Sequence, residues 1–435
     1  MNKTRLFKKS LLAVTITTAT LASQQALAAG FQLNAQSATG IGRAFAGDAV
    51  IADNASVMAR NPAAMALFDK TELSLGFESI TSMIEVKDAT YSSGAYIPAT
   101  GTTIITQSKD ADADGIGDTS IAPNIHLIVP VSDKFAWGIN AYSNFGTKTE
   151  FKDDYVAAEY GGLTDVKSFN LGLATSYRID EHWSLGAGLD LIYGQGTFKR
   201  AVPGTNSAAY LLNVDKADGF AFGFNIGTVY ELDENNRFGL SYRHSPTFSA
   251  KDDAGQKVTL PLPDMAEFSG YHKIEDTKFA VHYSVQWIGW GSFETIDFEN
   301  LDSSESALAA AGSTYEKEYQ WKDGWHFALG GTYYLNQDWT VRAGYMYDTS
   351  AQDDLTSISV PDSDRQWLST GFTYHIDSSS NIDFGITYLM GKETDVKESL
   401  VLPSSSSPTG YAYTEVSGKT KADAILLGLQ YSRSF

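Results

Sequence analysis

The sequence predicts an all-β protein, a transmembrane antiparallel β-barrel of about 14 strands with an N-terminal hatch (a plug) inside the lumen. Three observations predict it: repeated period-two alternation of apolar residues, alternating short and long connections, and an aromatic-rich composition. The 435 residues include 23 Tyr, 23 Phe, 8 Trp and 38 Gly. A barrel wall needs one apolar residue in two, with aromatic girdles at the membrane surfaces. A secreted soluble all-β protein is the alternative reading of the composition.

Residues 1–28 have the layout of an export signal peptide. Four Lys or Arg residues fall within the first nine positions, a short apolar stretch covers 11–22, and Ala26-Leu27-Ala28 forms a small-residue cleavage site. Export agrees with the complete absence of cysteine, which leaves no disulfide scaffold. The net charge of −20 argues against nucleic-acid binding. Together with a barrel fold, the signal predicts the outer membrane of a Gram-negative cell.

Residues 29–70 form the predicted hatch. The segment is rich in Ala and other small residues and shows no sustained alternation, but it carries too many apolar side chains to stay solvated comfortably. Its Asn61-Pro62-Ala63 triplet is a local stop, because Pro62 has no backbone donor and disfavours helix at Asn61. The alternative is a disordered leader in front of an open porin.

Residues 71–435 form the predicted barrel. In one segment Leu171 and Leu173 alternate with Asn170 and Gly172, and the same pattern recurs in several later segments. Short polar turns, such as Asp180-Glu181, alternate with longer polar segments, such as 88–118 and 244–264. Seven hairpins, and therefore fourteen strands, account for the length. The last strand is apolar on one face and ends at Phe435, like the signal read by the barrel assembly machinery.

The opening segment GFQLNAQSATGIGRAFAGDAVIADNAS and the Asn61-Pro62-Ala63 triplet resemble the hatch of FadL-type outer-membrane long-chain fatty acid transporters. The resemblance continues along essentially the whole chain after the leader. It implies passive uptake without a cofactor and without enzymatic activity. The ligand would bind in the lumen and leave sideways into the membrane after the hatch rearranges, with Asn61, Pro62 and Ala63 at the gate.

The resemblance also implies two ligand-binding cations and one irregular strand. Segments 192–200 and 315–323 resemble family strands that present an arginine and a lysine, here Arg200 and Lys317, to a fatty acid carboxylate. A buried carboxylate must be paired, and these side chains offer a bidentate fork and a point charge. Segment 134–146 resembles the strand that kinks and opens the wall, with Asn144 and Gly146 as the candidate positions. From the residues alone, ordinary loop charges are the favoured reading of Arg200 and Lys317, and an ordinary strand end is at least as good a reading of Asn144 and Gly146.

A local acidic repeat is a weak candidate for calcium. Asp110, Asp112, Asp114 and Asp118 alternate with small residues, as in calcium loops, but position twelve is Ile121 rather than Glu. A solvated acidic loop is the favoured interpretation. Catalysis is disfavoured, because the seven histidines show no HExxH spacing and no G-x-S-x-G motif occurs.

The predicted partners are long-chain fatty acids or similar hydrophobic ligands, outer-membrane lipids and lipopolysaccharide, and the assembly machinery. A monomer is expected. Two other functions stay open at this point. One is a channel for aromatic hydrocarbons or other uncharged hydrophobic compounds, and the other is a nonspecific porin or surface receptor barrel.

Overall fold

The computed structural model describes residues 30–34, 36–204, 209–310, 312–404 and 407–435. The predicted signal peptide lies outside these residues. Within them, no helix has the length and apolarity needed to cross a bilayer.

Fourteen of the described strands form a closed antiparallel ring, here called the wall. Each strand is hydrogen-bonded to the next, and the last returns to the first. The prediction of a fourteen-stranded barrel is confirmed. In chain order the wall strands are β1 (Glu72–Ile97), β4 (Thr119–Pro130), β5 (Phe135–Tyr142), β7 (Leu163–Arg178), β8 (Trp183–Ala201), β9 (Tyr210–Glu231), β10 (Asn236–His244), β13 (Met265–Lys273), β14 (Phe279–Ile288), β17 (Gly324–Tyr334), β18 (Trp339–Asp348), β19 (Arg365–Asp377), β20 (Ser380–Gly391) and β22 (Tyr411–Ser434).

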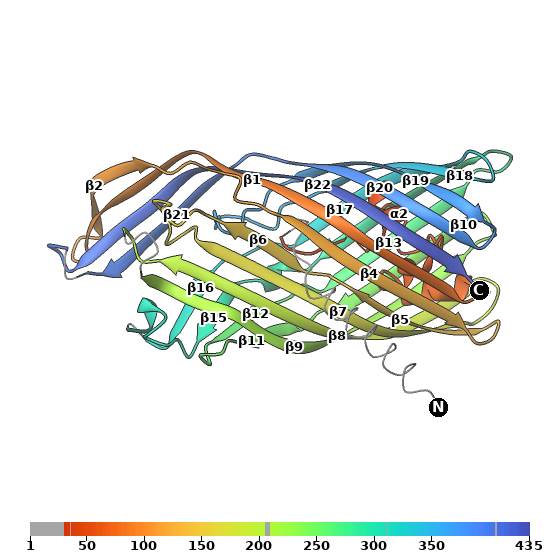
Figure 1. Cartoon of the computed structure of the whole chain (residues 1–435), viewed down its shortest axis with the longest axis horizontal. Coiled ribbons are helices and arrows are strands. Elements are labelled where there is room, and N and C mark those ends of the chain that lie inside the picture. Colours follow the sequence, from red (N-terminus) through yellow and green to blue (C-terminus); the bar gives the residue numbers. More distant parts are fainter. Residues whose placement is uncertain (1–29, 35, 205–208, 311, 405–406) are drawn as a thin grey trace, which may run out of the picture.

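Further strands extend the barrel at the end away from the C-terminus, on the left in Figure 1. They correct one expectation, because the long polar segments are largely strand rather than irregular loop. Residues 88–118 continue β1 and return as β2, since alternating Thr and Ser side chains satisfy a two-stranded ladder without an apolar face. The extension strands are β2 (Thr102–Asp110), β3 (Ala113–Asp114), β6 (Gly146–Glu150), β11 (Thr247–Lys251), β12 (Lys257–Pro261), β15 (Thr295–Glu299), β16 (Thr314–Glu318) and β21 (Thr394–Pro403).

The wall is apolar outside and polar inside. On β7, Leu173 is 54% exposed while the neighbouring Asn170 is fully buried, and on the next two strands Phe222 is 76% exposed while Asp190 is 2% exposed. A soluble sandwich would show the opposite sense, with its apolar face inward. The exposed apolar face of this barrel therefore fits bilayer hydrocarbon.

Residues 30–69 lie inside the ring, in the half of the barrel nearer the C-terminus (Figure 1). Helix α2 contacts β18, β19, β20 and β22, whereas η2 contacts β7, β8 and β9 on the other side of the lumen. Such contacts on opposite sides mean that the segment fills the cross-section. The described helices are α2 (Ala38–Gly42) and the 3₁₀ helices η1 (Ala55–Ala59), η2 (Pro62–Leu67), η3 (Trp290–Ser292) and η4 (Ala307–Ala310).

The Asn61-Pro62-Ala63 triplet of the hatch packs directly against two glycines of the wall. Asn61 caps η2, its side chain accepting a hydrogen bond of 3.0 Å from the Ala63 backbone N–H. A Cβ added at Gly186 would lie 2.2 Å from the Ala63 nitrogen, and one added at Gly227 would lie 2.0 Å from Asn61 Oδ1. The triplet can approach the wall this closely because both positions lack a side chain.

We therefore expect Gly186→Ala to destabilise the folded barrel by about 1–3 kcal/mol, because the new methyl group must displace backbone atoms of the triplet. Thermal unfolding in detergent measures the change. Gly331→Ala is the matched control, since its Cβ would meet its nearest atom at 3.6 Å. Equal unfolding temperatures for the two variants would show that the triplet is not held against the wall.

Candidate functional site

The structure brings Arg200 and Lys317 to one cavity of about 90 Å³. Arg200 lies near the end of β8 and Lys317 lies on β16, more than a hundred residues later in the chain. The cavity is otherwise lined mainly by aromatic and aliphatic side chains, among them Phe198, Phe298 and Tyr319. The cavity thus brings the two cations predicted from the sequence together in largely apolar surroundings.

Arg200 is held by neutral oxygens. One terminal nitrogen donates to the backbone carbonyls of Leu163 and Lys199 at 2.7 and 2.9 Å, and the other donates to the Thr164 hydroxyl at 2.6 Å. These contacts fix the guanidinium in place without neutralising it. A fixed guanidinium without a carboxylate partner among these contacts is well prepared to receive one from a ligand.

Lys317, in contrast, already has a carboxylate partner. Its ammonium lies 2.6 Å from Glu398 Oε2 and 5.9 Å from the centre of the Tyr319 ring. Burial by itself lowers the pKa of Lys317, but the negative charge of Glu398 more than offsets it, and the pKa lies above its ordinary value. The lysine is therefore charged at neutral pH.

Sequence analysis did not single out the acidic residues of this cavity. Glu398 lies on β21, and Glu159 lies in the segment between β6 and β7, where its carboxylate accepts a 2.9 Å hydrogen bond from Tyr91. Burial raises the pKa of Glu159 above its ordinary value. Neither residue belongs to a motif, and their positions in polar segments gave no signal that a cavity would enclose them.

A second, smaller cavity neighbours the charged one. Phe198 lines both the charged cavity and this cavity of about 20 Å³. The second cavity is lined mainly by apolar side chains, including Phe145, Val166 and Leu262.

At Phe145 the third wall strand is interrupted. β5 ends at Tyr142 and β6 begins at Gly146, so residues 143–145 leave the ladder. Asn144 lies inside this break, and Gly146 is the first residue after it. The two residues singled out from sequence therefore lie within and at the edge of the interruption.

The break leaves a stretch of the wall, here called the opening, in which β4, among the residues described, has no ladder hydrogen bonds to the third wall strand. β5 pairs with β4 only as far as Ala141 and Ile125, and within the described residues no ladder pair joins β4 to β6. Toward the extension strands, the Glu150 backbone N–H donates to the Ile116 carbonyl at 2.9 Å, and the Lys148 ammonium lies 3.0 Å from the Asp118 carboxylate. These contacts limit the opening at one end, and the Ile125–Ala141 pair limits it at the other.

The N-terminal segment covers the inner side of this opening. The Leu33 N–H donates to the Asn144 carbonyl at 2.8 Å, and the Gly146 N–H donates to the Phe31 carbonyl at 2.9 Å. The Phe31 ring packs against Trp290 with 4.7 Å between ring centres. The N-terminal segment is therefore hydrogen-bonded to residues within and next to the break.

A buried charged cluster anchors the same segment. The Arg365 guanidinium pairs with Asp362 and lies 3.6 Å from Asp348, and all three side chains are fully buried. Asp362 also accepts a hydrogen bond from the Gly30 backbone. The loop between β18 and β19 therefore fixes the start of the described chain.

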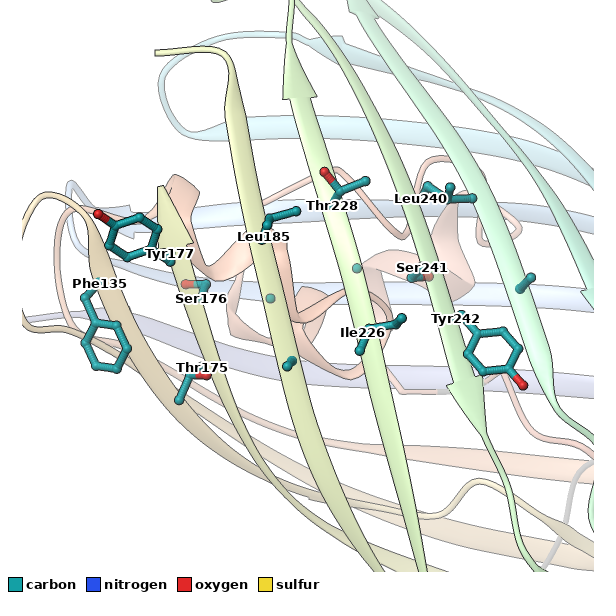
Figure 2. A pocket seen from close by; sticks show the side chains of 14 residues that line it. Phe135, Thr175, Ser176, Tyr177, Leu185, Ile226, Thr228, Leu240, Ser241 and Tyr242 are labelled. Carbon is teal, nitrogen blue, oxygen red and sulfur yellow. The ribbon is translucent and has the colours of Figure 1, made fainter. Parts of the chain in front are cut away.

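The hatch triplet lies deeper in the lumen, away from the charged cavity. Asn61 donates from its side chain to the carbonyls of Ala49 and Thr228 at 2.9 and 3.1 Å, linking the hatch to β9. Across the wall from it, a concavity of about 700 Å³ on the outer face is shown in Figure 2. Its lining includes the exposed Tyr177, Leu185 and Ile226 (Figure 2), so it faces lipid and is separate from the charged cavity.

The acidic repeat does not converge on a common point. Asp112 accepts from the Ala89 backbone at 2.7 Å, Asp110 accepts from the backbone of Asp112 at 3.1 Å, and Asp118 pairs with Lys148. Asp114 belongs to the short strand β3. In the part of the chain that the structure describes, no group of three or more His, Cys, Asp or Glu residues could hold a metal ion.

A closed barrel with an apolar outer face, a filled lumen and a charged inner cavity defines an outer-membrane transport protein. The chain belongs to the family described as outer membrane protein transport protein (OMPP1/FadL/TodX), whose model matches residues 19–435. The long-chain fatty acid transport protein of Salmonella typhi is 34% identical, over 92% of this chain and 95% of its own. Outer membrane protein P1 of Haemophilus influenzae is 33% identical over 99% of both chains.

The fold is also that of a solved relative. The crystal structure of a Pseudomonas aeruginosa FadL homologue superimposes with a TM-score of 0.77 at 22% identity, covering 94% of this chain and all of the other. The family places the protein in the outer membrane of a Gram-negative bacterium and among transporters of hydrophobic compounds.

Proposed function

We propose that this protein takes up long-chain fatty acids passively across the outer membrane. The observation that carries the proposal is Arg200, a fixed guanidinium whose hydrogen bonds, among the described residues, go to neutral oxygens in a largely apolar cavity that it shares with Lys317 and Glu398. An uncharged aromatic hydrocarbon has no charged group to pair with the two cations, so its binding would not offset the free-energy cost of burying them. A carboxylate with a long alkyl tail uses both the cations and the apolar side chains around them.

The exit is lateral. Burial is worth about 0.8 kcal/mol per CH₂ group, so release of a sixteen-carbon chain into water would cost about 12 kcal/mol. Passage through the break at 143–145 delivers the chain to bilayer hydrocarbon and avoids that barrier. Asn144 and Gly146 serve as the irregular positions of the wall, while movement of the hatch, anchored at Asn61-Pro62-Ala63, accompanies passage. No cofactor or catalytic step is involved.

The surroundings of the barrel follow from its surface. We infer a monomer, assembled by the barrel assembly machinery through the C-terminal strand, with outer-membrane lipid around the wall. Ile425, Leu427 and Leu429 form an exposed apolar face on β22, and the strand ends beside the exposed Phe435. Lipopolysaccharide would surround the outer part of the barrel.

Binding of oleate and of oleyl alcohol to the purified protein tests the proposal. We expect Arg200→Met and Lys317→Met each to weaken oleate binding by about thirtyfold, because each removes one of the two desolvated cations that would pair with the ligand carboxylate. Oleyl alcohol binding should hardly change, since the Met side chain preserves the apolar stem.

Lys322→Met is the matched control. Lys322 is exposed and pairs with Asp353 at 3.0 Å outside the lining of the cavity. Unchanged oleate affinity in the Arg200 and Lys317 variants would reject the carboxylate site and favour a channel for uncharged compounds. Large single-channel conductance in the wild type would instead favour an open porin.

A further inference from the structure

Glu398 holds the position that a ligand carboxylate would take beside Lys317. Its Oε2 atom accepts from the lysine at 2.6 Å, its Oε1 atom accepts from the Ile358 backbone N–H at 2.8 Å, and its side chain is 5% exposed. It lines the same cavity as both cations. The empty transporter thus carries a carboxylate of its own in the headgroup site.

We propose that Glu398 is an internal counter-carboxylate that an incoming fatty acid must displace from Lys317. This inference rests on the proposed function of the cavity. Arg200, whose hydrogen bonds go to neutral oxygens, is free to meet the ligand carboxylate first. Exchange at Lys317 then replaces one carboxylate by another, so the ammonium keeps a partner throughout, while the Glu398 carboxylate gives up its cation.

The exchange also selects the ligand. A hydrocarbon or an alcohol offers no negative charge and cannot replace Glu398 beside the ammonium. Such ligands leave the Lys317 pair closed, whereas an acid opens it. Glu398 is therefore a specificity-determining residue that discriminates through competition rather than through contact with the alkyl chain.

Displacement of Glu398 reaches beyond the cavity, because the same side chain holds the loop between β18 and β19 through Ile358. In that loop the Ser359 carbonyl accepts a 2.6 Å hydrogen bond from Thr149 on β6, next to the wall opening. Asp362 of the same loop holds Gly30 at the start of the segment that covers the opening. Release of the Ile358 N–H therefore loosens a loop that contacts β6 beside the opening and also contacts the segment that covers the opening.

Glu398→Gln tests the proposal, because it removes the charge while keeping an oxygen for the Ile358 N–H. We expect the variant to bind oleate about tenfold more tightly than wild type, since the ligand no longer breaks a charge-assisted pair. Affinity for oleyl alcohol should stay the same. In a Lys317→Met background the gain from releasing the ammonium is lost and only relief of repulsion between the two carboxylates remains, so the effects of the two substitutions should be non-additive, which a double-mutant cycle measures.

Glu299→Gln is the matched control, because Glu299 also pairs with a lysine, Lys257 at 3.2 Å, but lies outside the lining of the cavity. It should leave oleate affinity near that of wild type. Weaker or unchanged oleate binding in Glu398→Gln, with Lys317→Met still harmful, would overturn the counter-carboxylate alone. Failure of Lys317→Met and Arg200→Met to weaken oleate would reject the proposed function itself.

Discussion

A variant that lacks residues 30–69 is expected to conduct ions through planar bilayers in discrete open-channel steps, at least about ten times larger than any background of the intact protein. The physical reason is geometry, because a fourteen-stranded ring is wide enough for water once its filling is removed. In the intact protein the hatch touches strands on opposite sides of the lumen. Single-channel recording of both proteins measures the difference.

The control for this experiment removes a small exposed part of the extension. Deletion of residues 98–101, the exposed turn between β1 and β2, leaves the lumen unchanged and should not raise conductance. A silent hatch-deleted barrel would show that something other than residues 30–69 closes the lumen. A conducting control would show that the assay detects general damage.

The second large effect is expected at Arg365, on folding rather than on transport. Arg365→Met leaves Asp348 and Asp362 fully buried without their cation. Breaking a buried pair by removing one partner costs about 3–5 kcal/mol of folding free energy. The temperature at which the folded band disappears on an unheated denaturing gel should therefore fall markedly.

Arg433→Met is the matched control, because Arg433 is exposed and its guanidinium lies over the Phe435 ring. It should change stability by about 0.5 kcal/mol or less. A further variant that combines Arg365→Met with Asp348→Asn and Asp362→Asn should regain part of the loss, because the uncompensated charges are then gone. An Arg365→Met protein as stable as wild type would contradict the role of this cluster.

The wall could be predicted because its signal is local. Each wall strand shows alternation at the level of neighbouring residues, as at Leu171 and Leu173, and turns such as Asp180-Glu181 mark the strand ends. Strand number then follows from counting. The extension strands were harder, because β2 is exposed on both faces and is stabilised by pairing with β1 rather than by burial.

The charged cavity could be predicted only in part. Arg200 and Lys317 were selected through a resemblance to known strands, and the structure brings them to one cavity. Glu398 could not be selected, because its partner lies 81 residues away in the chain and no local pattern marks the pair. Contacts between residues so far apart in the chain depend on how the extension strands meet beyond the end of the wall. The alternation of apolar and polar residues carries no information about that arrangement.

The extension has a practical consequence for work on living cells. β1 has 26 residues, about 85 Å of strand at roughly 3.3 Å per residue, while the bilayer core is about 30 Å thick. Even a strand tilted by about 40° rises far beyond the hydrocarbon. The turn at 98–101 therefore stands well clear of the membrane, where an epitope tag or a single labelled cysteine, absent elsewhere in the chain, would report on the protein from outside the cell.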